Sequence, residues 1–121
     1  MKTTQYITVI LLILFLSSCV QQCHDKIVTF KVDMRQVEQI ESVGIKGNLP
    51  PLSRDEILPL TDDNNDGIYE AKITINTAKN QLYFKFTKNG EVELKNQDNR
   101  VLNFKYEQET LTYLAVFDVL D

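Results

Sequence analysis

The sequence contains no tryptophan, one histidine, two cysteines and no block of basic residues. Two cysteines are too few for a disulfide framework, so the fold must be stable without one. The only histidine lies near the N-terminus, and no nucleophile has an identifiable base. A net charge of -4 without a basic block argues against binding to nucleic acid. We therefore expect a protein that is not an enzyme, needs no cofactor and does not bind nucleic acid.

The N-terminal segment has the features of an export signal. Residues 7–16 form an apolar run, interrupted only by Thr8, that is too short to cross a bilayer. Residues 16–19, LSSC, resemble the bacterial lipobox, whose small residues fit the signal peptidase and whose cysteine receives diacylglycerol. We expect residues 1–18 to be removed, Cys19 to carry the lipid, and the chain to be anchored in the bacterial cell envelope. Gln21, where an aspartate would favour the inner membrane, favours the outer membrane. The alternative is an ordinary secretory signal with a chance cysteine.

Residues 19–26 are interpreted as a lipidated tether. With Cys19 alkylated, Cys23 would have no partner within the chain. The neighbouring His24 makes a Cys-His pair that resembles part of a metal site or of a nucleophile and its base. Two ligands on a tether are too few for a stable zinc site, so we assign no metal to this pair.

From residue 27 to residue 121, apolar and polar residues alternate with a period of two, which is typical of half-buried strands. No segment carries a sustained helical period. The pattern predicts one all-β domain, an antiparallel immunoglobulin-like β-sandwich of seven to eight short strands. We expect Phe30, Val32, Ile45, Ile73, Phe84 and Phe86 in its core. The expected strands are residues 27–35, 42–47, 58–60, 69–75, 81–88, 91–94, 101–105 and 110–119, with an Asn89-Gly90 hairpin turn.

The acidic run DDNNDGIYE at residues 62–70 raises the question of a calcium site. Asp62, Asn64, Asp66 and Gly67 match the first half of an EF-hand-type loop. Position 12 of that loop would be Ile73, an inward strand residue that cannot bind calcium. Because Asp, Asn and Gly are also the residues that a tight turn selects, we interpret the run as a turn and keep a weak calcium site as the alternative.

Several stretches, taken in order along the chain, resemble the starch-binding domains of carbohydrate-binding module family 20. VTFKVDM is similar to that family's first strand, VGIKGN to its second and DGIYEAKITI to its middle strand. LYFKF resembles the strand that reads YEYKF in the family, and VELKNQDNR resembles a segment that ends in asparagine and arginine. The similarity covers about residues 27–120 and implies a sandwich that binds α-glucan.

The resemblance also implies positions for a sugar site. In the family, two tryptophans stack on glucose rings while a lysine and an asparagine bind hydroxyl groups. By position, these correspond to Arg54 and Val92 for the tryptophans, Lys85 for the lysine and Asn99 for the asparagine. Glu93 is the neighbouring acid, and Tyr69 corresponds to an aromatic residue of a second site. The alternative for Tyr69, from the strand alternation, is a core position. Because both tryptophans are replaced, any sugar binding should be weak.

Two functions follow from these expectations. The first is a lipid-anchored module that binds a glycan weakly, α-glucan or another polysaccharide, or contributes to glycan uptake. The alternative is a lipoprotein that binds an envelope protein or plays a structural role and retains the fold without the sugar site. Exposed tyrosines beside Lys85, among Tyr83, Tyr106 and Tyr113, would favour the glycan. An apolar surface patch would favour a protein partner.

Overall fold

The computed structural model describes residues 21–121. The expected signal peptide and the lipidation site at Cys19 lie outside the described residues. Within the described part, no helix is long and apolar enough to cross a membrane.

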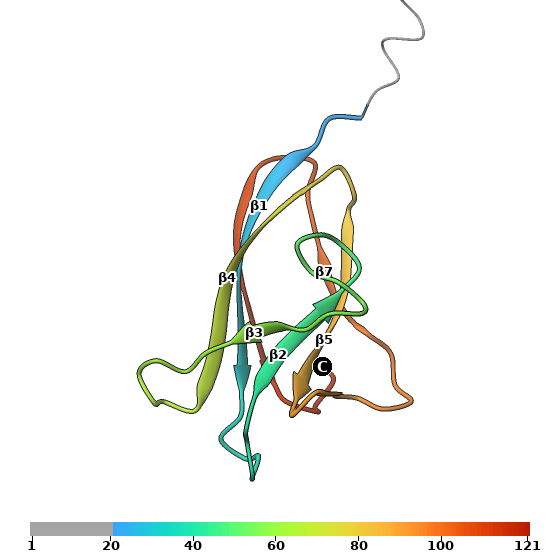
Figure 1. Cartoon of the computed structure of the whole chain (residues 1–121). Helices are drawn as coiled ribbons and strands as arrows, with labels where there is room; N and C mark the ends of the chain where they lie inside the picture. Colours follow the sequence, from blue (N-terminus) through green and yellow to red (C-terminus); the bar gives the residue numbers. More distant parts are fainter. Residues whose placement is uncertain (1–20) are drawn as a thin grey trace, which may run out of the picture.

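The described chain forms two facing β-sheets (Figure 1). The first has the order β4-β1-β8, from β4 (Ile68–Thr77), β1 (His24–Asp33) and β8 (Glu109–Val116). The second has the order β3-β2-β5-β6, with β7 paired to the same side of β5 as β6. Its strands are β2 (Val43–Gly47), β3 (Leu58–Leu60), β5 (Gln81–Lys88), β6 (Glu91–Val92) and β7 (Arg100–Asn103). The predicted all-β sandwich is confirmed.

One strand pair departs from the antiparallel pattern. β1 pairs with β4 in antiparallel orientation from His24 to Asp33, but it pairs with β8 in parallel orientation from Lys26 to Asp33. Parallel neighbours cannot be joined by a tight turn and need a long crossover. Here β5, β6 and β7 of the second sheet lie between β4 and β8 in the chain, and β8 then runs alongside β1 in the same direction.

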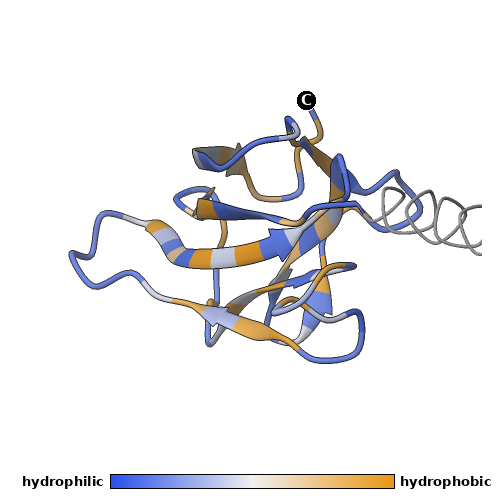
Figure 2. Ribbon diagram, turned by 90° about the horizontal axis from the view of Figure 1, so that it is seen from above, coloured by the Kyte–Doolittle hydropathy of each residue, from blue (hydrophilic) through white to orange (hydrophobic). Residues whose placement is uncertain are grey.

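The core lies between the two sheets and follows the alternation seen in the sequence. Figure 2 shows apolar and polar positions alternating along the strands, with hydrophilic connecting loops. The rings of Phe30 and Phe84 meet edge to face across the core, with centroids 5.1 Å apart. Tyr113 packs on Phe84 from β8 at 4.9 Å. All six residues expected in the core are buried: Phe30, Val32, Ile45, Ile73, Phe84 and Phe86.

β1 begins three residues before residue 27, where the domain was expected to start. β1 begins at His24, so His24, Asp25 and Lys26 belong to the sheet and pair with β4. Lys26 is only 1% exposed, and its Nζ donates hydrogen bonds to Glu109 Oε2 at 2.9 Å and to the carbonyl oxygens of Lys105 and Glu107. A lysine at an inward strand position is tolerated because these three acceptors replace its water.

The hairpin after β5 forms as predicted, but its second strand is shorter than expected. Asn89 and Gly90 have φ values of 51° and 84°, which is the geometry that a two-residue hairpin turn requires. β6 ends at Val92, because Leu94 adopts a φ of 54° and turns the chain out of the sheet. The resulting loop leads to β7 and contributes to the site described next.

Candidate functional site

A hollow of about 380 Å³ opens on the outer face of the second sheet, beside β2 and β5. It includes all four positions that the resemblance aligned with the family's main sugar contacts. Arg54 comes from the loop after β2, Lys85 from β5, Val92 from β6, and Asn99 from the loop before β7. The full lining consists of Lys46, Gly47, Asn48, Arg54, Tyr83, Phe84, Lys85, Val92 and Asn99. The fold therefore brings together residues that are far apart in the sequence.

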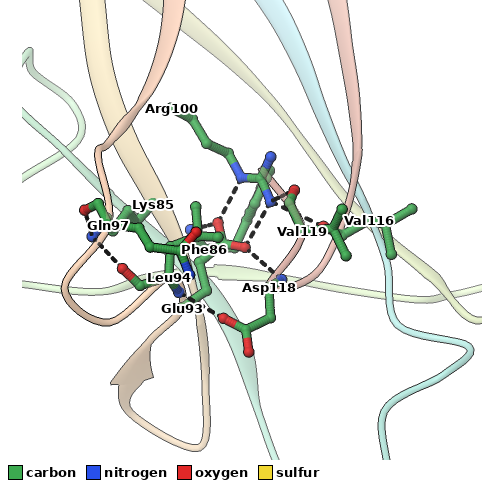
Figure 3. Close-up of polar contacts among 9 residues, drawn as sticks. All are labelled: Lys85, Phe86, Glu93, Leu94, Gln97, Arg100, Val116, Asp118 and Val119. Atoms are coloured by element: carbon green, nitrogen blue, oxygen red, sulfur yellow. Dashed lines mark hydrogen bonds and ion pairs between the residues drawn. The ribbon is translucent and has the colours of Figure 1, made fainter. Parts of the chain in front are cut away.

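Lys85 is held in place by the loop that follows β6. Its Nζ donates hydrogen bonds to the carbonyl oxygens of Leu94 at 2.9 Å and Gln97 at 3.0 Å (Figure 3). An ammonium group has three donors, so one remains for a ligand. The two acceptors are neutral carbonyl groups, which orient the ammonium group without cancelling its charge.

Tyr83 provides the aromatic surface of the hollow. Its side chain is 39% exposed, and it also lines a second hollow of about 550 Å³. Its hydroxyl donates a hydrogen bond to Gln81 Oε1 at 2.6 Å, and its backbone N–H donates to Asn48 Oδ1 at 2.9 Å. Asn99 also borders both hollows, whereas Asp98 and Asp121 line only the second. The two hollows therefore adjoin at Tyr83 and Asn99.

Of the three tyrosines considered from the sequence, only Tyr83 lies beside Lys85. Tyr113 is half-buried between the sheets and borders only the second hollow. Tyr106 is exposed, but its ring packs edge to face on His24, with centroids 4.7 Å apart, and lines neither hollow. One aromatic residue, in place of two tryptophans, is available at the first hollow.

The expectation that Glu93 contacts sugar is corrected by the structure. Glu93 is only 2% exposed. Its Oε2 accepts hydrogen bonds from Arg100 Nε at 2.7 Å and from Phe86 N at 2.8 Å. Its Oε1 accepts from Arg100 Nη2 at 2.8 Å and Asp118 N at 2.9 Å (Figure 3). The carboxylate has no surface for a ligand, and it joins β5, β7 and the C-terminal segment instead.

The expected second-site aromatic, Tyr69, lies elsewhere. It is on β4 in the first sheet, opposite Val32, and is half-buried against the core. It lines neither hollow. We therefore do not include Tyr69 in the candidate site.

In the acidic run, the carboxylate and amide side chains accept hydrogen bonds from the turn's own backbone. Asp62 Oδ2 accepts from Gly67 N at 2.9 Å and Asp62 Oδ1 from Asp66 N at 3.1 Å, while Asn64 Oδ1 accepts from Asp66 N at 3.4 Å. Asp66 Oδ1 accepts from Ile68 N at 2.9 Å, and this hydrogen bond is the main reason that the pKa of Asp66 is below its ordinary value. Gly67 has a φ of 82°, as the turn requires. These contacts support the interpretation as a structural turn.

Cys23 is exposed and free, and it immediately precedes β1. Among residues 21–121, no three histidine, cysteine, aspartate or glutamate residues are grouped in a way that would hold a metal ion.

Sequence reasoning missed the two polar residues that β2 and the position after it contribute to the hollow, Lys46 and Asn48. Both lie in the VGIKGN stretch, where alternation from the buried Val43 and Ile45 places Lys46 on the outer face. This alternation in the sequence indicated that the side chain of Lys46 points outward. Asn48 follows the end of β2 and had no such signal, because its role depends on the pairing of β2 with β5.

Comparison with known proteins does not assign the chain to a family. No family model matches the chain, and no curated protein shows significant similarity to it. The resemblance to starch-binding domains therefore stays a prediction.

Proposed function

We propose that this protein is a non-catalytic, lipid-anchored module of the bacterial envelope that binds glycan weakly through the hollow beside β5. The proposal is supported by the meeting of Arg54, Lys85, Val92 and Asn99 in one hollow. The same hollow contains an exposed tyrosine and amide groups, which are side chains suited to sugar rings and hydroxyl groups. The LSSC motif and Gln21 support anchoring in the outer membrane.

The affinity should be low because most of the stacking surface is missing. An aromatic platform contributes roughly 1–3 kcal/mol per ring, by analogy with nucleic-acid bases. Tyr83 provides one platform, whereas the family's site has two tryptophans. Hydrogen bonds to sugar replace hydrogen bonds to water and contribute only about 0.5–1.5 kcal/mol each. We expect dissociation constants for maltooligosaccharides of ~1 mM or higher, which corresponds to about -4 kcal/mol, and no retention on insoluble starch.

An NMR titration with maltoheptaose tests this proposal at the expected affinity. Chemical shifts of Tyr83, Lys85 and Asn99 should move together, and Tyr83→Ala should abolish the movement. Tyr106→Ala is the matched control, because Tyr106 is exposed but lines neither hollow. The proposal would be contradicted if maltoheptaose caused no chemical-shift change in the unaltered protein, or changed only the shifts of residues on another face.

A second candidate function is binding to an envelope protein through β8. β8 is an edge strand of the first sheet, with β1 on one side only. Leu114 on this strand is 58% exposed, and Val116 is also exposed. An uncovered edge strand with apolar side chains is suited to the addition of a partner's strand. This function would be favoured if a protein that co-purifies with the unaltered chain were lost in the Leu114→Lys variant, and if sugar titrations showed no binding.

A further inference from the structure

Two lysines occupy directly opposed positions on the outer face of the second sheet. Lys46 of β2 and Lys85 of β5 are register partners in the antiparallel pair. Directly opposed side chains on one face have Cβ atoms about 4.5–5.5 Å apart, and like charges at such positions are destabilising. A sequence selected for stability alone would place an acid opposite one of these lysines.

Within residues 21–121, neither lysine forms a salt bridge. Arg54 brings a third cationic group to the same hollow, and no carboxylate is among its lining residues. Five salt bridges occur within residues 21–121, and none involves Lys46, Arg54 or Lys85. The chain has more acids than bases, so three unpaired cations around one hollow run against its overall composition.

Local arrangements that oppose stability without compensation are expected at functional sites. Here the missing component is a negative charge. A carboxylate placed between Lys46 and Lys85 would relieve their repulsion, and the guanidinium of Arg54 is suited to bind a carboxylate through two parallel hydrogen bonds. The outward ring of Tyr83 beside them offers a surface for the apolar face of a sugar ring.

We infer that the hollow selects an acidic glycan, one whose sugar rings carry carboxylates, over a neutral α-glucan. This inference rests on the proposed glycan-binding function and names its ligand class. The carboxylate lies at the Lys46–Lys85 end of the hollow. The remainder of the oligosaccharide extends past Tyr83 and Asn99 toward the second hollow, where Asp98 and Asp121 disfavour a second acidic group.

The experiment compares trigalacturonate with maltoheptaose and with sodium sulfate in low-salt buffer. A hydrogen bond to a charged group is stronger than one to a neutral hydroxyl group, so trigalacturonate should bind at least about tenfold more tightly than maltoheptaose. Its affinity should fall as salt is added, whereas that of maltoheptaose should not. Sodium sulfate should bind more weakly than trigalacturonate, because it makes no contact with Tyr83.

Two variants separate a specific site from general charge attraction. Lys46→Gln removes one of the opposed cations and should reduce trigalacturonate affinity about tenfold, whereas maltoheptaose affinity should fall by a much smaller factor because maltoheptaose carries no charge. The same change should leave stability equal or slightly higher, because it removes the like-charge pair. Lys72→Gln is the matched control, because Lys72 is exposed on β4 in the other sheet and has no salt bridge within residues 21–121.

Equal affinity for trigalacturonate and maltoheptaose would overturn the inference and leave the proposed function standing. Binding of neither would overturn both. Equal binding of sulfate and trigalacturonate, or an equal loss on Lys72→Gln, would show charge attraction without sugar recognition and would also overturn the inference.

Discussion

Arg100 is a charged side chain buried within the sandwich, and its contacts explain how that burial is tolerated. The residue is 1% exposed, and its guanidinium donates two hydrogen bonds to Glu93 and two to the carbonyl oxygens of Val116 and Val119. Burial by itself lowers the pKa of Arg100, but the hydrogen bonds and charge of Glu93 raise it well above its ordinary value. The guanidinium of Arg100 therefore keeps its positive charge despite its burial.

Glu93→Gln should destabilise the protein strongly. The substitution keeps the shape of the side chain but leaves Arg100 buried without a countercharge, which typically costs about 3–5 kcal/mol. Urea unfolding followed by circular dichroism measures the loss. Glu91→Gln is the control, because Glu91 pairs with Lys95 on the surface at 3.4 Å and should change stability by less than about 0.5 kcal/mol. Similar small losses for both variants would show that the buried pair contributes little.

At the scale of elements, the first strand extends farther than its apolar pattern indicates. Residues His24, Asp25 and Lys26 pair with Thr77, Asn76 and Ile75 of β4. Asn76 Nδ2 also donates a hydrogen bond to Asp25 Oδ1 at 2.7 Å. A chain that begins at Ile27 should therefore melt at a lower temperature than one that begins at Gln21.

Lys26→Met in the longer chain identifies the source of that loss. The substitution keeps the strand but leaves the carboxylate of Glu109 without its cation, so it should reproduce much of the destabilisation. Thermal melts of the three proteins provide the comparison. Equal melting temperatures for the chains that begin at Gln21 and Ile27 would show that residues 21–26 act only as a tether.

The turn before β4 gives another prediction at this scale. Asp62→Ala removes the acceptor for the backbone N–H groups of Asp66 and Gly67, and should cost about 1 kcal/mol. Millimolar calcium should change the melting temperature little, because the oxygens of the turn already accept backbone hydrogen bonds. A calcium-dependent rise of many degrees that disappears in Asp62→Ala would establish a metal site instead.

The strands could be predicted from the sequence because a period of two is a local property. The three buried charges could not, because Lys26, Glu93 and Arg100 resemble surface residues until their partners are known. Glu93 meets Arg100 only because the chain between them leaves the sheet at Leu94, whose positive φ is unusual for leucine.

The candidate site was predicted in part: Arg54, Lys85 and Asn99 were identified by resemblance. The opposition of Lys46 and Lys85 depends on strand register, which no single stretch reveals.

At the scale of the whole molecule, the proposed attachment to the membrane depends on the N-terminal segment. The net charge is -4, and an acidic domain gains no attraction from anionic lipid headgroups. The proposed anchoring therefore relies on covalent lipid, which holds a protein stably at a membrane when more than one acyl chain is attached. Four residues separate Cys19 from the start of β1 at His24, a distance of at most about 18 Å when extended. Lipidation at Cys19 would thus hold the sandwich close to the bilayer.

Cys19→Ala tests this arrangement directly. The precursor should remain uncleaved by lipoprotein signal peptidase and should incorporate no fatty-acid probe, because the thiol that receives diacylglycerol is absent. Cys23→Ala is a closely matched control, since it removes the chain's other cysteine and should leave labelling and membrane fractionation unchanged. Labelling that persists in Cys19→Ala but disappears in Cys23→Ala would move the attachment to Cys23, and labelling of neither parent nor variants would indicate an ordinary secretory signal. In that last case the domain would be released from the membrane, and its hollow would have to capture glycan without being held at the envelope.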